Sequence, residues 1–468
     1  MESSTQSPPA VRTSSQSDIP RMQRCSRLIE KLRSYGSRPC IEDGENCYTY
    51  DQLIDEFENW GARFDVLAVS PGNVVGIRAD YSFSAVAAVL SLLARRALVA
   101  MIPRDRDPSR YLADAHATCL LEFDAEGNHE WTHVRGQISH PLVDRLRDSG
   151  DGGIIIFTSG TTGRPKAALQ STERFLYKLG NSGGCFRTIA FMLFDHIAGL
   201  DTALYTLAEG GTLIITRSRD PEAILRLVES HKADVLPTSP SFLRLLCATD
   251  NSTQRDLSSL KVIAYGSEPM DTNTLERVSL RFPNARVSQK YGTTETGTPR
   301  ASSRSSDSLW LKIKGTDLKV VDDILWIRSE GTILGYLNAP SPIDDQGWYC
   351  TGDLVEVDGE WIKVRGRKAD VINVGGEKVS PAEVEQTILQ LPFVRDTVVA
   401  GQAHELMGQI VTARVSLTEA MDPKEATARI RAHCREHLAP HKAPVRIEIS
   451  AEGFSNARQK AQRKPRTD

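Results

Sequence analysis

The stretch IIIFTSGTTGRPKAALQS, residues 154–171, joins an apolar strand-like run to a loop of hydroxyl side chains and glycines that ends at Lys166. Glycines let backbone N–H groups approach a ligand closely, hydroxyls add donors, and lysine adds a compact positive charge. The loop is therefore predicted to hold a phosphate. It is neither the P-loop G-x-x-x-x-G-K-[ST], because Gly160 and Gly163 lie only three residues apart, nor the dinucleotide motif G-x-G-x-x-G.

The segments around this loop alternate between strand and helix patterns. SAVAAVLSLLARRA (84–97) is typical of a buried helix, ALVAMIP (97–103) of a strand and PEAILRLVESHKA (221–233) of an amphipathic helix. This alternation predicts an α/β fold of mainly parallel sheets covered by helices. Around Trp326 the pattern changes to short strands and turns, which predicts a small distorted β unit. A smaller α+β unit follows residue 366, so the expected domains are a disordered tail (1–20), a large N-terminal domain (21–366) and a small C-terminal domain (367–468).

Composition excludes several classes of protein. The net charge of −3 gives no electrostatic case for nucleic acid, and no apolar run is long enough to insert into a membrane. The first 20 residues lack the apolar core of a signal peptide. Eight cysteines without a C-x-x-C pair argue against zinc and disulfides and favour a cytoplasmic protein with reduced thiols.

Five further stretches carry chemistry-bearing residues, and each alone has an ordinary structural explanation. They are LFDHIAGL (193–200), YGSEPM (265–270), YGTTETG (291–297), YCTGDL (349–354) and GRKADVINVGGEKVSPAEVE (366–385). Taken together and in this order, they resemble the adenylate-forming superfamily of acyl- and aryl-CoA synthetases, nonribosomal peptide adenylation domains and luciferases. The resemblance extends from about Tyr48 to Arg463, which is most of the chain.

The resemblance implies a mobile C-terminal domain and a two-step reaction. A small carboxylic acid attacks ATP, in the presence of Mg²⁺, to give acyl-AMP and pyrophosphate. The acyl group then passes to a thiol, on CoA or on the phosphopantetheine of a separate carrier protein. The ending LAPHKAP (438–444) and the absence of a following carrier domain favour a stand-alone acyl- or aryl-CoA ligase. The particular acid and the oligomeric state are left open.

The resemblance also implies site residues, and the chemistry explains their types. Attack on the α-phosphorus concentrates negative charge, so catalysis needs cations and donors. A carboxylate suits Mg²⁺, and two carboxylate oxygens suit a ribose diol. The implied contacts are Thr158, Ser159, Gly160, Thr161, Thr162, Gly163 and Lys166 with the β- and γ-phosphates; Gly266, Ser267, Glu268 and Pro269 with adenine; Tyr291, Gly292 and Thr293 with the nucleotide; Thr294 with the α-phosphate; Glu295 with Mg²⁺; Asp353 with the ribose; and Arg367 with the nucleotide near the hinge.

Two motifs concern the acid and the thiol. His196 in LFDHIAGL matches a residue that lines the reacting carboxylate and gates the thiol tunnel, although a histidine between apolar residues is often a core residue. Asp195 either orients His196 or caps a turn, or it anchors an amine on the substrate. After rotation of the C-terminal domain, Gly375 and Gly376 are expected beside the pantetheine tunnel, where a thin thiol arm needs close backbone approach.

The chain also departs from the usual motifs. Lys460 matches the lysine that completes the adenylation site, but Gln459 replaces the usual glycine, and a shifted alignment would select Arg458. The segment also fits a solvated basic tail. Ala369 stands at a hinge position that is usually charged, and the loop reads P-K-A where P-K-G is usual. Transfer to a non-thiol nucleophile, an amine or a small inorganic anion, stays open, as does a non-catalytic nucleotide-binding protein with a decayed site.

Overall fold

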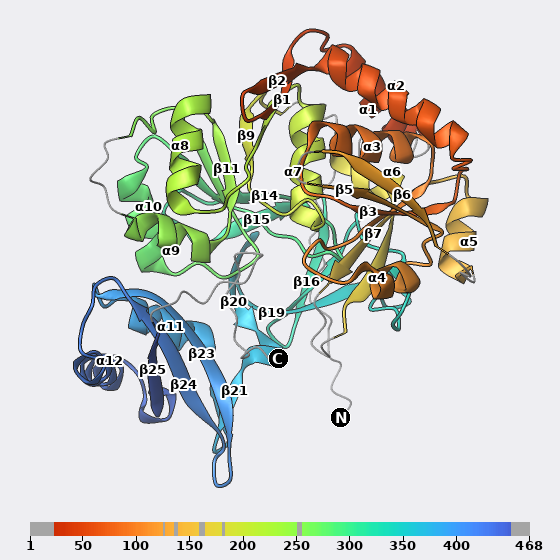
Figure 1. Cartoon of the computed structure of the whole chain (residues 1–468). Helices are drawn as coiled ribbons and strands as arrows, with labels where there is room; N and C mark the ends of the chain where they lie inside the picture. Colours follow the sequence, from red (N-terminus) through yellow and green to blue (C-terminus); the bar gives the residue numbers. More distant parts are fainter. Residues whose placement is uncertain are drawn as a thin grey trace.

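The computed structural model of the protein describes residues 23–124, 127–134, 139–158, 164–179, 183–249 and 255–450. The predicted tail, residues 1–20, lies outside this part of the chain. Helices and strands alternate as the sequence predicts, and the α/β fold with a smaller α+β C-terminal unit is confirmed (Figure 1). Among the described residues, no helix has both the length and the apolar character needed to cross a membrane.

Two seven-stranded sheets form the framework of the N-terminal part. The first has the order β13-β12-β11-β9-β10-β1-β2 and is parallel except for the β1–β2 pair. Its strands are β1 (Pro39–Asp43), β2 (Asn46–Thr49), β9 (Arg187–Ala190), β10 (Thr212–Ile215), β11 (Val235–Thr238), β12 (Val262–Tyr265) and β13 (Arg286–Gln289). The second has the order β18-β8-β7-β4-β3-β5-β6, with β7, β4, β3 and β5 parallel. Its strands are β3 (Val74–Arg78), β4 (Leu98–Met101), β5 (Cys119–Phe123), β6 (His129–His133), β7 (Gly153–Thr158), β8 (Lys166–Ser171) and β18 (Gly335–Tyr336).

Helices form layers between and outside these sheets. Apolar side chains surround α3 (Phe83–Ala94) and α7 (Ile197–Ala208) on nearly every side, as expected of buried helices. They share one core cluster with strands of both sheets, together with α1 (Arg24–Arg33) and α2 (Tyr50–Val66). The outer face of the first sheet packs on α8 (Pro221–His231), α9 (Pro240–Ala248) and α10 (Thr272–Arg281), and that of the second on α4 (Pro108–Asp114) and α5 (Pro141–Asp148) (Figure 1). Two short helices, α6 (Thr172–Phe175) and η2 (Leu176–Lys178), follow β8.

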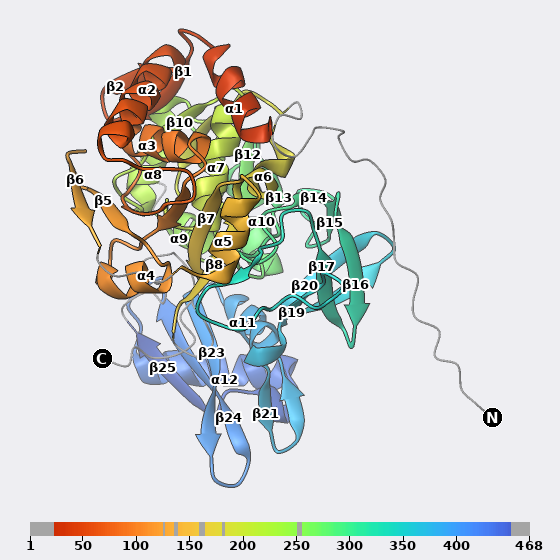
Figure 2. The same ribbon diagram turned by 90° about the vertical axis from the view of Figure 1, so that its right-hand side faces the viewer.

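The small β unit expected around Trp326 is an antiparallel sheet with the order β14-β15-β20-β19-β17-β16 (Figure 2). Its strands are β14 (Arg300–Ser303), β15 (Leu311–Lys314), β16 (Asp317–Val321), β17 (Ile324–Arg328), β19 (Tyr349–Asp358) and β20 (Trp361–Arg367). A short helix η3 (Lys368–Asp370) then leads to the C-terminal unit.

The C-terminal unit is a five-stranded sheet with two helices packed on it. Its order is β22-β21-β24-β23, with β25 beside β24. The bounds are β21 (Ile372–Val374), β22 (Glu377–Val379), α11 (Pro381–Leu389), β23 (Val394–His404), β24 (Gly408–Leu417), α12 (Pro423–His437), η4 (Pro440–Lys442) and β25 (Arg446–Ser450). The unit has its own hydrophobic core. It contacts the N-terminal part through α9, α10 and β20.

Candidate active site

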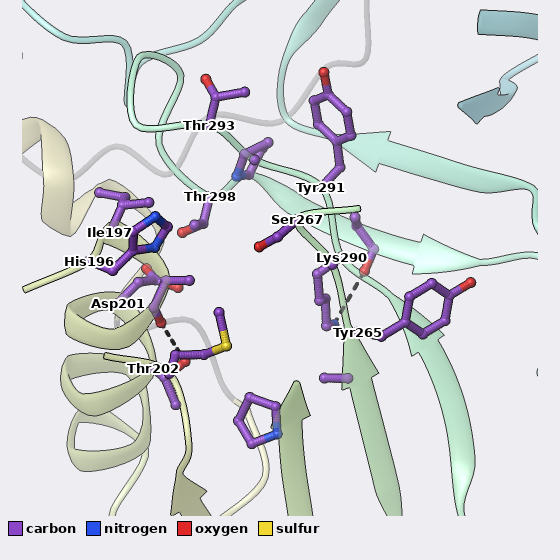
Figure 3. A pocket seen from close by; sticks show the side chains of 18 of the residues that line it. His196, Ile197, Asp201, Thr202, Tyr265, Ser267, Lys290, Tyr291, Thr293 and Thr298 are labelled. Atoms are coloured by element: carbon purple, nitrogen blue, oxygen red, sulfur yellow. Dashed lines mark hydrogen bonds between the residues drawn. The ribbon is translucent and has the colours of Figure 1, made fainter. Parts of the chain in front are cut away.

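A cleft of about 990 Å³ opens between α7, the first sheet and the antiparallel sheet (Figure 3). In open α/β folds, ligands bind beyond the carboxyl ends of the parallel strands, and the loops after β12 and β13 line this cleft. Eleven of the predicted site residues line it: Thr158, Lys166, His196, Gly266, Ser267, Tyr291, Gly292, Thr293, Thr294, Glu295 and Arg367. Residues far apart in the sequence therefore surround one cavity.

The predicted phosphate loop connects two antiparallel strands. Thr158 at the end of β7 is paired with Lys166 at the start of β8, so both residues flank the base of the loop. Asn338 fixes this base, because its amide donates to the Pro165 carbonyl at 2.9 Å and accepts from the Ala167 backbone N–H at 2.9 Å. Ser159, Gly160, Thr161, Thr162 and Gly163 lie outside the described residues. The structure thus places the ends of the loop at the cleft.

The predicted metal ligand, Glu295, is held by a tyrosine. Tyr336 donates its hydroxyl to Glu295 Oε1 at 2.6 Å, and the Lys166 ammonium lies 5.0 Å from the Tyr336 ring centroid. Burial raises the pKa of Tyr349, and the nearby Glu295 carboxylate raises it further. A single carboxylate fits Mg²⁺, which commonly takes one or two protein carboxylates and fills its other positions with water and phosphate oxygens. Among the described residues, no cluster of three metal-ligating side chains competes with this position.

The turn that carries Glu295 is rigid. Thr293 and Thr296 exchange hydrogen bonds of 3.2 Å between each backbone N–H and the other residue's hydroxyl. Ile333 N–H donates to the Glu295 carbonyl at 2.9 Å. Thr294 and Glu295 are each 8% exposed and both line the cleft. The geometry holds a hydroxyl and a carboxylate beside one another.

Asp353 lies directly behind the cleft wall. It accepts a hydrogen bond from the Tyr291 hydroxyl at 2.6 Å and one from Arg367 Nε at 3.1 Å, and both donors line the cleft. Burial raises the pKa of Asp353, although Arg367 and Tyr291 oppose the shift. Each carboxylate oxygen accepts one of these hydrogen bonds and keeps a further lone pair.

His196 stands at the N-cap of α7 and faces into the cleft (Figure 3). The turn before it is tight, because His196 N–H donates to the Leu193 carbonyl at 3.1 Å. Gly199 is required here, since a Cβ would meet the Leu193 oxygen at 1.9 Å. The helix start therefore fixes where the imidazole enters the cavity.

Only half of the segment that is expected to contact adenine lines the cleft. Gly266 and Ser267 line the cleft, and Ser267 has a left-handed φ of 73° that is unusual for a residue with a side chain. Glu268 and Pro269 do not line it. The Glu268 carboxylate instead accepts from the Ser241 hydroxyl at 2.6 Å, away from the cavity.

The predicted glycine pair is also not brought to the cleft. Gly375 and Gly376 lie in the exposed turn between β21 and β22, with left-handed φ values of 59° and 97°. Lys460 and its alternative Arg458 lie outside the described residues. At the predicted hinge, Ala369 and Asp370 line the cleft beside Arg367.

Sequence comparison decides the family. The sequence model described as "AMP-binding enzyme" matches residues 28–337, and the one described as "AMP-binding enzyme C-terminal domain" matches residues 383–458. The chain belongs to the AMP-binding enzyme family. Within this family, a 4-coumarate–CoA ligase of Oryza sativa subsp. japonica is 25% identical over 459 residues, covering 84% of this chain and 83% of that protein. An indoleacetate–CoA ligase of Aromatoleum aromaticum is 28% identical over 290 residues, 56% of each chain.

Solved structures of AMP-binding enzymes share the fold. The anthranilate CoA ligase AuaEII in complex with anthranoyl-AMP has a TM-score of 0.79 at 21% identity, covering 93% of this chain and 95% of that chain. The resemblance seen in the sequence is confirmed by the two family models, and the solved structure confirms the fold.

Sequence reasoning missed three groups of cleft residues. Tyr336 holds Glu295 through its hydroxyl, and Tyr349 also lines the cleft, where only its position directly before the CTGD run pointed to it. Lys178 and Asp201 form a 2.7 Å ion pair in the cleft wall, and Lys290, directly after β13, also lines the cleft. No local pattern marks these residues, because the contacts join elements distant in sequence.

Proposed function

We propose that the protein is an ATP-dependent acid–thiol ligase that forms acyl-AMP from a small carboxylic acid, releases pyrophosphate, and passes the acyl group to CoA. The observation that supports this most is the convergence of Lys166, Thr294 and Glu295 on one cleft, with Asp353 behind its wall. These are the cation, hydroxyl and carboxylates that attack on an α-phosphate needs.

Each side chain has a distinct task in this proposal. Lys166 and Thr158 neutralise and bind the outer phosphates, and Thr294 donates to the α-phosphate. Mg²⁺, when bound at Glu295, adds positive charge that stabilises the leaving pyrophosphate. Asp353 accepts the ribose hydroxyls, and His196 lines the reacting carboxylate at the start of α7. Lys460 supplies a further cation during adenylation.

The acceptor and the location are part of the proposal. CoA is proposed because the two relatives compared above are CoA ligases; a carrier-protein phosphopantetheine is the alternative thiol. A cytoplasmic location is consistent with eight cysteines that form no disulfide.

Pyrophosphate release from ATP by the full-length protein, with a panel of carboxylic acids and Mg²⁺, tests the proposal. We expect acid-dependent release, followed by an acyl thioester when CoA is added. Acid-dependent release without consumption of CoA would overturn CoA as the acceptor. No release with any acid would overturn the adenylation itself.

A further inference from the structure

One ammonium in the cleft wall joins two elements that carry predicted site residues. Lys178, the last residue of η2, donates to Asp201 Oδ2 at 2.7 Å, to the Thr298 carbonyl at 2.7 Å and to the Thr298 hydroxyl at 2.6 Å. A lysine ammonium has three protons, so these three acceptors use all of them. Asp201 belongs to α7, whereas Thr298 belongs to the loop between β13 and β14. Lys178 therefore holds a helix and a loop that are distant in sequence against one another.

The helix and the loop face the same cavity (Figure 3). On α7, Asp201 lies five residues after His196, which is about 7.5 Å along a helix at ~1.5 Å per residue. On the loop, Thr298 lies three residues after Glu295. Lys178 thus fixes the separation between the wall that carries His196 and the wall that carries Thr294 and Glu295.

The backbone of Lys178 is fixed as well. Arg300, the first residue of β14, donates to the Lys178 carbonyl at 3.0 Å. Through the short helix α6, η2 continues from β8, which begins at Lys166 at the base of the predicted phosphate loop. Three parts of the cleft wall therefore meet at Lys178: the second sheet, α7 and the loop after β13.

Burial indicates what this ion pair contributes. The side chains of Lys178 and Asp201 are only 10% and 15% exposed. Two charges this far from water lose most of their hydration, and that loss offsets much of their attraction, so the pair adds little net stability. It does impose geometry, because the three acceptors surround the ammonium in only one arrangement of helix and loop.

We propose that Lys178 is a positioning residue for adenylation, which sets the distance between the acid beside His196 and the α-phosphate beside Thr294. This inference rests on the proposed acid-activating function, and Lys178 takes no part in the bond changes. Attack needs the reacting atoms about 3–3.5 Å apart, and a misplacement of about 1 Å can cost on the order of 10²-fold in rate. Once acyl-AMP has formed, a covalent bond sets that distance, so the need for Lys178 ends.

The test measures the two half-reactions of the full-length enzyme separately. Pyrophosphate release with ATP and each acid of a panel (4-coumarate, indoleacetate, anthranilate, hexanoate and malonate among them) reports acyl-AMP formation. Thioester formation from synthetic acyl-AMP and CoA reports transfer. Lys178→Met removes the ammonium with little change of length. We expect kcat for pyrophosphate release to fall on the order of 10²-fold, while KM for ATP and acid, and the rate of transfer, change less than about three-fold.

The panel separates positioning from a direct contact with the substrate. If Lys178 acts by holding two walls of the cleft, the fractional loss of kcat is the same for every acid that the wild-type enzyme activates. If Lys178 or Asp201 binds the acid itself, the losses differ between acids of different shape and polarity and lie mainly in KM.

A double variant separates positioning from stability. Lys178→Met with Asp201→Leu replaces both charges by apolar side chains of similar size, so that neither charge is left buried alone. We expect its Tm to be closer to the wild-type value than that of Lys178→Met, while pyrophosphate release stays equally slow. Lys261→Met is the matched control, because Lys261 forms a 2.6 Å pair with the mostly buried Asp234 and neither residue lines the cleft. It should leave the ratio of the two half-reactions unchanged.

Four results would overturn the inference: an unchanged kcat for pyrophosphate release in Lys178→Met, equal losses in both half-reactions, losses that depend on the acid and lie in KM, or a double variant that recovers its rate together with its Tm. If Lys178→Met does not fold, the rate of the double variant decides. In each of these cases the wild-type enzyme still releases pyrophosphate. No release with any acid would instead contradict the proposed function.

Discussion

Arg244 of α9 and Asp396 of β23 form an ion pair of 2.9 Å across the boundary between the N-terminal part and the C-terminal unit, with side chains only 8% and 1% exposed. Arg244 also donates to the Ser241 hydroxyl at 3.0 Å, and Ser241 in turn donates to Glu268. Glu268 follows directly after Ser267 in the cleft wall. The pair therefore connects the position of the C-terminal unit to the lining of the cleft.

Breaking this pair should release the C-terminal unit. Asp396→Asn leaves the Arg244 guanidinium buried without its closest counter-charge, which typically costs about 3–5 kcal/mol while the interface stays closed. Undocking avoids that cost by returning Arg244 to water. We expect a larger radius of gyration by small-angle X-ray scattering and a lower Tm. Glu58→Gln, in an exposed pair with Arg33, is the control and should change neither. An unchanged radius and Tm would show that other contacts hold the interface.

Glu295→Gln should lower adenylation while leaving the fold intact. If Glu295 is a ligand of Mg²⁺, losing one transition-state interaction typically costs on the order of 10²–10³ in rate. Tyr336→Phe removes the 2.6 Å hydrogen bond that orients Glu295 and should have a smaller effect, about ten-fold, together with a higher Mg²⁺ requirement. Pyrophosphate release at varied Mg²⁺ measures both. Tyr48→Phe, remote from the cleft, is the control. An unaltered Mg²⁺ dependence in Glu295→Gln refutes the metal assignment.

When the pH is lowered, the affinity for ATP should begin to fall at a higher pH than the ordinary pKa of an aspartate would give. Burial raises the pKa of Asp353 above the ordinary value of 3.8, and the charge of Asp370 raises it further. Arg367 and Tyr291 oppose this shift. A raised folded-state pKa means that the folded protein binds the proton more tightly than the unfolded chain. Between the two pKa values, acidification therefore favours folding at this residue, while it removes the carboxylate that the ribose needs.

Calorimetric ATP titrations across the acid range measure this effect. Asp353→Asn should bind ATP weakly at neutral pH and should retain only the pH dependence of ATP itself. Wild-type protein whose affinity follows the same acid profile as Asp353→Asn would show that Asp353 does not contact the nucleotide.

The glycine pair should matter for the second half-reaction. Gly375 and Gly376 are remote from the cleft in this structure, so a substitution there leaves the described site untouched. If rotation brings them to the thiol tunnel, Gly376→Leu should slow thioester formation at least ten-fold more than acyl-AMP formation. Gly359→Leu is a matched control, because Gly359 also has a left-handed φ, of 59°, with open space around it. Equal losses in both half-reactions would mean that the substitution has only damaged the C-terminal unit.

The sequence predicts more of the fold than of the site. Continuous apolar residues identify α3 as a buried helix, and the glycines and hydroxyls after β7 identify a ligand loop, because both signals are local. Arg244 appears as one polar position of an amphipathic helix, and its partner Asp396 lies 152 residues away. Lys290 appears as an ordinary strand end until α7 closes over the same face of the sheet. Tertiary contacts of this kind leave no periodic trace in the sequence.

Lys460 is expected to act in only one of the two half-reactions. If it bridges the attacking carboxylate and the ATP phosphates, Lys460→Ala should cut acyl-AMP formation on the order of 10²-fold or more, the scale of a lost charge at a developing phosphorane. Transfer from pre-formed acyl-AMP to the thiol should barely change, because that step needs no charge at the phosphates. Arg458→Ala is the matched variant, since the planar guanidinium is a poor substitute for an ammonium in such a bridge. If Arg458→Ala forms no acyl-AMP while Lys460→Ala forms it normally, the adenylation role belongs to Arg458. Two active variants would mean that neither residue serves adenylation.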